Sequence, residues 1–224
     1  MELDLQPLLL TFKLATISSL LLLLLGTIIA CWLANGRGKI YLTGEILVAL
    51  PLILPPSVLG FYLLLLFSPE SLTGQIIESL TGLRLLFSFE GLIAASVIAT
   101  LPFMVFPVKS GIENLPVSLR EASATLGKST FTTSLRVLLP NIKPSLLAGF
   151  VLSFAHVVGE FGVVLMIGGG IPGETKVASI ALYDEVEALN YGTAHFYALG
   201  LFTVTFLVLV FVYFYNKRSL LKGF

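Results

Sequence analysis

From Glu121 to Gly127 the chain reads EASATLG, and ten residues after that glycine it reads VLLP, from Val137 to Pro140. The stretch is polar and positively charged, and it lies between segments apolar enough to cross a bilayer. Loops between rigid elements often carry binding functions. We therefore expect an ordered loop in this region, about residues 110–143 and called the inner loop below, on which another protein docks.

The composition identifies the class of protein. Of the 224 residues, 56% are hydrophobic and only 12% are charged, and the mean hydropathy is +0.98, whereas soluble domains carry about 25% charged residues. We expect an all-α integral membrane protein. Basic and acidic residues balance at 13 each, which predicts no nucleic-acid partner. The single cysteine, Cys31, excludes an internal disulfide, and two histidines make a Cys/His metal site untenable.

Five stretches reach the length of about 20 mostly apolar residues that a spanning helix needs. They run from Leu14 to Ala34, Ile46 to Phe67, Phe89 to Val108, Ser145 to Ile167 and Phe196 to Tyr215. No low-complexity linker divides them. The sequence therefore predicts a single transmembrane domain over residues 1–224, built as a bundle of about five helices.

The basic residues predict the orientation, because inner loops of membrane proteins are enriched in Lys and Arg. With the N-terminus outside, the outer segments hold only Lys13, Arg84 and Lys176. The C-terminus is then inside. Trp32, Tyr213 and Tyr215 fall near inner ends, where aromatic rings favour the headgroup region. The inner segments hold the other basic residues: Arg37, Lys39, Lys109, Arg120, Lys128, Arg136, Lys143, Lys217, Arg218 and Lys222.

The inner loop reads as two short helices joined by a turn. Pro116 suits a first helical turn, and Leu119, Ala122 and Leu126 recur at helical spacing. Gly127 is expected in the left-handed conformation that ends a helix, and Ser129 can cap a second helix that runs into Leu138. Composition alone leaves two uses open: docking into a groove on a partner, or lying on the membrane surface.

The same stretch resembles the EAA loop of ABC-importer permeases. That loop has Glu-Ala-Ala, three residues, Gly, nine residues and an Ile-x-Leu-Pro ending; here Ser123 takes the third position and Val137 stands for Ile. The resemblance implies a cytoplasmic coupling helix that seats in an ATPase subunit. The ATPase-coupling positions it implies are Glu121, Ala122, Leu126, Gly127, Leu139 and Pro140.

The run Gly127-Lys128-Ser129 looks like the end of a phosphate-binding P-loop, but that motif needs a glycine where this chain has Ala122. We therefore expect no ATP site and no bound cofactor in this chain. ATP and Mg²⁺ are expected in the partner ATPase.

The second stretch contains three prolines, Pro51, Pro55 and Pro56. A proline inside a helix removes a hydrogen bond and kinks the helix. In lipid the freed backbone groups must find partners or line a cavity, and transporters use broken helices near their pathway. A packing kink and a pathway element both fit this sequence.

The fourth stretch carries an acid, Glu160, flanked by Gly159 and Gly162. Acidic residues within spans are costly and mark function or a specific partner. At helical spacing Ser153, His156 and Glu160 share one face with Gly149, and His156 and Glu160 are spaced to interact. We favour a structural or gating hydrogen bond for Glu160, and we assign these residues with the three prolines to a provisional translocation pathway.

Three further motifs resemble the permease subunits of molybdate importers: LPLILPP from Leu50 to Pro56, GEFG from Gly159 to Gly162, and IPGETK from Ile171 to Lys176. The second also resembles sulfate permeases. The resemblance implies the type I ABC-importer permease fold in the cytoplasmic (inner) membrane. It also implies a homodimer, two cytoplasmic ATPase subunits, and a soluble binding protein that delivers molybdate or tungstate.

Such a chain is a transport subunit and no enzyme, with no catalytic or metal-binding residues. A sulfate or thiosulfate importer is the main alternative. A passive anion channel would not need the ordered inner loop. An intramembrane enzyme built on His156 and Glu160 lacks a nucleophile or metal set.

Overall fold

In the computed structural model, residues 4–221 are described, except for the side chains at positions 212, 213 and 215–221 in the last helix. Every regular element in this part of the chain is a helix, which confirms the expected all-α class. In order they are α1 (Gln6–Asn35), α2 (Lys39–Ile53), α3 (Pro56–Phe67), α4 (Leu72–Thr81), α5 (Phe89–Glu113), α6 (Val117–Thr125), α7 (Thr130–Thr133), the π-helix η1 (Ser134–Leu138), α8 (Leu139–Asn141), α9 (Lys143–Gly159), α10 (Gly162–Gly168), α11 (Ala178–Glu187) and α12 (Tyr191–Leu221).

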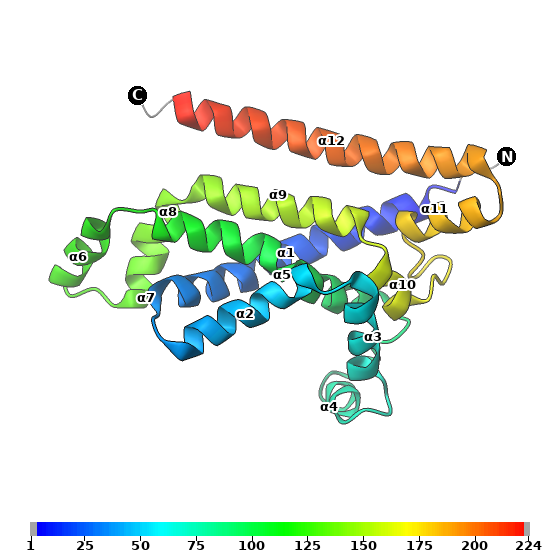
Figure 1. Ribbon diagram of the computed structural model, residues 1–224, viewed down its shortest axis with the longest axis horizontal. Coiled ribbons are helices and arrows are strands. Elements are labelled where there is room, and N and C mark those ends of the chain that lie inside the picture. Colours follow the sequence, from blue (N-terminus) through cyan, green and yellow to red (C-terminus); the bar gives the residue numbers. More distant parts are fainter. Residues whose placement is uncertain (1–3, 222–224) are drawn as a thin grey trace.

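The centre of the molecule is a bundle of α1, α5 and α9 (Figure 1). Small residues on these helices, such as Ala15, Ala95 and Ala99, are buried where the helices meet. Close approach of backbones at small residues is how helices associate in membranes. Two apolar clusters fill the bundle, one around Leu92 and Val157 and the other around Met104 and Ile112.

Within residues 4–221, three helices are long and apolar enough to cross a membrane, and up to five spans result if each bent helix pair counts as one. The continuous ones are α1, α5 and α12 within Tyr191–Phe211. The second span is broken at its prolines, as the sequence indicates, because α2 and α3 meet at 115°. The fourth is also interrupted, since α9 ends at Gly159 and α10 starts at Gly162.

The proline pair explains the sharper break. A residue before proline is pushed out of the helical region, and Leu54 and Pro55 are both extended, with ψ of 138° and 136°. Pro56 then starts α3, where its missing N–H costs nothing. Pro51, by contrast, lies inside α2 and does not end it.

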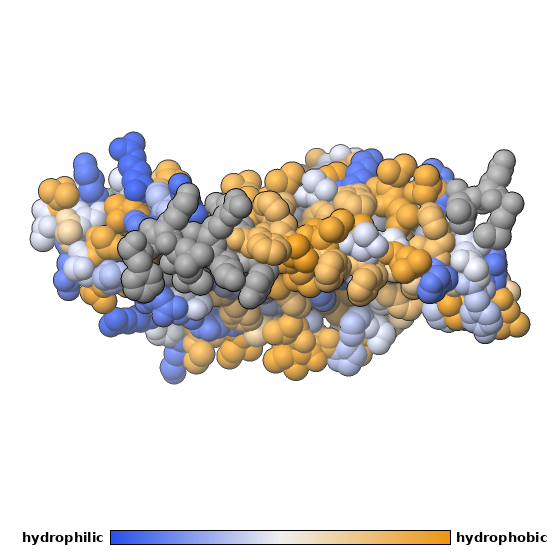
Figure 2. All heavy atoms as spheres, turned by 90° about the horizontal axis from the view of Figure 1, so that it is seen from above, coloured by the Kyte–Doolittle hydropathy of each residue, from blue (hydrophilic) through white to orange (hydrophobic). Residues whose placement is uncertain are grey.

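The surface is divided along the long axis. Figure 2 shows apolar side chains across the middle of the visible face and hydrophilic ones toward the ends, most densely at the end that holds α6. The inner loop and the ends of α1 and α5 lie at that end, and α10 and α11 lie at the other (Figure 1). The side chains of Tyr213, Tyr215, Lys217, Arg218 and Lys222, used above for orientation, lie outside the described part.

Candidate functional site

The inner loop folds as two short helices around a glycine turn, as the sequence predicts. Gly127 has φ +67°. Its N–H donates to the carbonyl of Ala124 at 2.9 Å, and the N–H of Lys128 donates to that of Ser123 at 3.1 Å. This pair of bonds is the Schellman pattern, which satisfies carbonyls at a helix C-terminus. Pro116 occupies the N-cap of α6 and not its first turn, a shift of one residue from the expectation.

The second helix is held to the first. Ser129 accepts a hydrogen bond from the N–H of Thr132 at 3.2 Å and caps α7, as expected. The hydroxyls of Ser123 and Thr133 lie 2.7 Å apart and join α6 to α7. Leu138, at the end of η1, is fully buried in the apolar cluster around Met104 and Ile112. The loop is therefore an ordered body attached to the bundle.

The predicted coupling residues divide into two groups. Glu121, Ala122, Leu126 and Gly127 lie on or next to α6 and are all exposed, whereas Leu139 is half-buried at the foot of the loop beside the exposed Pro140. The structure therefore does not bring the two ends of the motif into one patch. The residues on and next to α6 form an exposed surface. Leu139 and Pro140 lie where the chain re-enters the bundle.

Exposed apolar side chains mark the presented surface. Leu126, which lies outside the candidate spans, is 74% exposed, and Phe131, on α7, is 76% exposed. A groove of about 280 Å³ runs between the two helices and is lined in part by Leu119, Ala122 and Leu126. A polar loop with an exposed apolar groove fits a docking role for another protein.

The two broken segments meet. Helices α3 and α10 pack against each other, and a Cβ atom added at Gly162 would lie 3.0 Å from the Cβ of Pro56. Glycine at position 162 therefore permits the close approach of one break to the other. Gly159, at the other side of the same break, has no atom within 4 Å of its added Cβ.

Glu160 lies in the break between α9 and α10. Its backbone is extended, with ψ 130°, its side chain is only 7% exposed, and its carboxyl oxygen Oε2 has no hydrogen-bond partner among residues 4–221. The Oγ of the buried Ser96, on α5, also lacks a hydrogen-bond partner among the described residues. The Glu160 backbone carbonyl accepts a 2.7 Å bond from the hydroxyl of Ser179.

The expected pairing of His156 with Glu160 is wrong. Helical spacing would place them on one face, but the chain leaves the helix at Glu160. His156 instead stacks on Phe103, with ring centroids 4.2 Å apart. Ser153 is fully buried, and its hydroxyl has no partner in the described part of the chain. The polar face therefore ends one turn before the acid.

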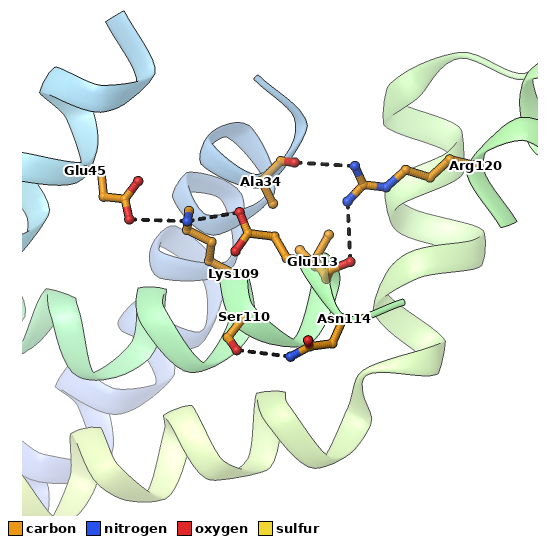
Figure 3. Close-up of polar contacts among 8 residues, drawn as sticks. Ala34, Glu45, Lys109, Ser110, Glu113, Asn114 and Arg120 are labelled. Atoms are coloured by element: carbon orange, nitrogen blue, oxygen red, sulfur yellow. Dashed lines mark hydrogen bonds and ion pairs between the residues drawn. The ribbon is translucent and has the colours of Figure 1, made fainter. Parts of the chain in front are cut away.

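Sequence reasoning missed the polar contacts at the end of the bundle next to the inner loop, which Figure 3 shows. The ammonium group of Lys109, on α5, lies 3.2 Å from the carboxylate of Glu45 on α2 and 3.0 Å from that of Glu113. Only the i,i+4 spacing of Lys109 and Glu113 was visible in the sequence. No group of three or more His, Cys, Asp or Glu side chains within the described residues could hold a metal ion.

At the opposite end, the glycine-rich connection from Gly168 to Lys176 is ordered by one side chain. The hydroxyl of Thr175 accepts from the N–H of Ile171 at 2.8 Å and donates to the carbonyl of Gly168 at 2.6 Å. Lys176 pairs with Asp184 of α11 at 2.6 Å. The IPGETK motif therefore forms a fixed loop at this end of the molecule.

Comparisons with known proteins agree with this architecture. Residues 23–220 match the family model described as the binding-protein-dependent transport system inner membrane component. The molybdenum transport system permease protein ModB of Azotobacter vinelandii is 43% identical, with 95% of this chain and 94% of that protein covered. The putative molybdenum permease YvgM of Bacillus subtilis is 32% identical, with 92% and 91% covered. A probable sulfate permease, cysT of Prototheca wickerhamii, is 29% identical, with 93% and 83% covered.

Solved structures share the fold. A bacterial alginate ABC transporter, in complex with an alginate-bound periplasmic protein, has a chain with a TM-score of 0.77 and 16% identity, with 98% of this chain and 80% of that chain covered. The MetNI methionine ABC transporter in an inward-facing conformation gives 0.75 and 17%, with 96% and 95% covered. At these identities the likeness shows a common fold and nothing about substrate.

Proposed function

Because this chain belongs to the family of binding-protein-dependent transport system inner membrane components, we propose that it is the membrane subunit of an ATP-driven importer of molybdate or tungstate. The observation that carries the choice of oxyanion is the 43% identity to the Azotobacter molybdenum permease over nearly the whole of both chains. Such a subunit moves the oxyanion across the membrane and does not catalyse a chemical reaction.

Sulfate import is the second candidate. The GEFG motif resembles one of sulfate permeases, and the probable sulfate permease of Prototheca wickerhamii is 29% identical. The lower identity places sulfate second. The two candidate functions predict that different oxyanions compete for uptake, so one competition experiment separates them.

The proposed assembly has two copies of this chain, two ATPase subunits and a soluble binding protein, and each copy is one permease domain. The inner loop would face the cytoplasm, with the N-terminus of the chain outside. The exposed apolar groove next to Leu126 supports the docking of an ATPase there. Glu121, Ala122, Leu126 and Gly127 would contact the ATPase, and Leu139 and Pro140 would anchor the loop. ATP and Mg²⁺ would be bound by the ATPase.

In this proposal the two breaks lie beside the translocation pathway. Broken helices in transporters are found where backbone groups line a cavity. The contact between Pro56 and Gly162 supports a single joint between two half-helices. ATP binding and hydrolysis would move these half-helices relative to the bundle. This movement would open the pathway to one side of the membrane at a time.

Specificity is tested with the reconstituted transporter and its binding protein loaded with molybdate, tungstate or sulfate. We expect molybdate and tungstate to stimulate ATP hydrolysis and to compete with each other for uptake. Sulfate should do neither at equal concentration. Stimulation by sulfate alone would replace the molybdate proposal with the sulfate one and leave the transporter proposal intact.

A further inference from the structure

Helix α6 makes few contacts with the bundle that it is proposed to move. It packs against its neighbours α7 and η1, and the Ser123–Thr133 hydrogen bond stays within the inner loop. A force applied to α6 by an ATPase reaches the bundle indirectly through η1, whose Leu138 is buried there, and directly only through contacts of α6 itself with the spanning helices.

Arg120, on α6, supplies such a connection (Figure 3). Its Nη1 donates to the carbonyl of Ala34 at 3.4 Å, and its Nη2 donates to the carbonyl of Ile112 at 3.4 Å. Ala34 lies in the last turn of α1 and Ile112 in the last turn of α5. One side chain therefore joins α6 to the ends of two core helices.

The chemistry of these three groups is complementary. Carbonyls in the last turn of a helix lack their usual N–H partner four residues on, and the C-terminal end of a helix carries partial negative charge. The Ile112 carbonyl also accepts from the N–H of Leu115 at 3.4 Å. A guanidinium presents several donors in a fixed plane and stays charged, so it can serve two carbonyls at once. An ammonium group concentrates its donors at one point and suits this geometry less well.

Neighbouring contacts tie these two core helices to other elements. Lys109 joins α5 to the middle of α2 through Glu45, and Asn35, at the end of α1, donates to the hydroxyl of Ser134 in η1 at 3.3 Å. A displacement of Arg120 therefore acts on helix ends that are themselves linked to α2 and η1.

We propose that Arg120 is a positioning residue that transmits movement of α6 to the ends of α1 and α5. The proposal rests on the coupling function proposed for the inner loop. Arg120 acts on the bundle and not on the ATPase, so its loss should separate ATP hydrolysis from transport while the subunits stay assembled.

The test uses the assembled transporter in vesicles with Arg120→Ala, Arg120→Lys and the control Lys143→Ala. Lys143 is an exposed cation at the far end of the inner loop and does not line the groove beside α6. For Arg120→Ala we expect ATPase co-purification within about twofold of the parent and uptake reduced about tenfold, the factor for losing a hydrogen bond from a charged group. Stimulation of ATP hydrolysis by loaded binding protein should be lost. Arg120→Lys should recover part of the uptake, and Lys143→Ala should match the parent per assembled complex.

Two results would overturn the inference. One is Arg120→Ala with parental uptake and stimulation. The other is a loss of uptake that follows a fall in melting temperature and in ATPase co-purification, which would make Arg120 a residue of general stability. A failure of the coupling function proposed for the inner loop is recognised by a different variant. If the loop does not couple to an ATPase, Gly127→Val should leave transport intact.

Discussion

Glu160 carries a buried carboxyl whose Oε2 has no hydrogen-bond partner in the described chain. An ionised carboxylate buried without a cation is costly, and glutamine keeps its shape without the charge. We predict that Glu160→Gln inserts normally and is at least as stable in detergent as the parent, because it removes a charge that has no buried cation beside it. Transport by this variant should fall, because intramembrane acids are retained for function.

Thermal unfolding of the purified protein and uptake in vesicles measure the two effects. Glu160→Ala is the comparison, and it should be less stable than the glutamine variant because it leaves a cavity. A glutamine variant less stable than the parent would contradict this interpretation, since it would mean that the assembled protein supplies the carboxylate with a partner.

Gly162 and Gly159 form a matched pair on the two sides of one break. A Cβ at Gly162 would lie 3.0 Å from Pro56, whereas one at Gly159 meets nothing within 4 Å. We predict that Gly162→Ala destabilises the protein by roughly 1–3 kcal/mol through overpacking. Gly159→Ala should be neutral or stabilise by less than about 1 kcal/mol. Equal melting temperatures for both variants would show that the two breaks do not need close contact.

At the scale of the element, the turn of the inner loop depends on the backbone of Gly127. Its φ is +67° and its added Cβ meets no atom within 4 Å, so any strain is conformational and not steric. A β-branched residue there should cost roughly 1–3 kcal/mol, whereas asparagine visits this conformation readily. We predict that Gly127→Val keeps normal membrane levels but loses ATPase association and transport, and that Gly127→Asn keeps both.

Membrane fractionation, co-purification and uptake test this prediction. Parental uptake by a well-expressed Gly127→Val protein would refute the coupling role of the loop. Loss of association in both variants would instead mean that the partner requires the absence of a side chain at this position.

The elements differ in how far the sequence predicts them. Capping chemistry is local, so the glycine turn and the cap at Ser129 are predicted correctly. The proline pair predicts a break after α2 but not its angle of 115°, which depends on the packing of α3 on α10. The break at Glu160 is missed because periodicity assumes a continuous helix. Helix α4 is missed as well, although Ser71 caps it and Gly82 ends it in the left-handed conformation.

At the scale of the whole molecule, composition predicts the class and the approximate number of spans. It does not predict which distant residues meet. Arg120 and Ala34 are 86 positions apart, and Asn35 and Ser134 are 99 apart. Such contacts follow from how the helices pack and leave no periodic signal. The family motifs identify the inner loop as important, but only the structure shows how it is attached.

The orientation of the whole molecule follows from its basic residues and remains a prediction. In a Cys31→Ala background, Ser118→Cys on α6 should react with a membrane-impermeant thiol reagent only when the inner side is accessible. Ser79→Cys on α4 should react only from the outer side. Both positions are exposed in the structure. Labelling in the reverse pattern would invert the topology and remove the inner loop from the cytoplasm.

The central claim is that this chain carries molybdate across a membrane at the expense of ATP hydrolysed by a partner. The most direct measurement is uptake of labelled molybdate into vesicles that contain the chain and its ATPase, with the loaded binding protein outside. ATP in the vesicle lumen, where the ATPase subunits face, should drive molybdate accumulation above its external concentration. A non-hydrolysable ATP analogue should not. Equal and rapid equilibration with and without ATP would contradict the account and identify a passive channel.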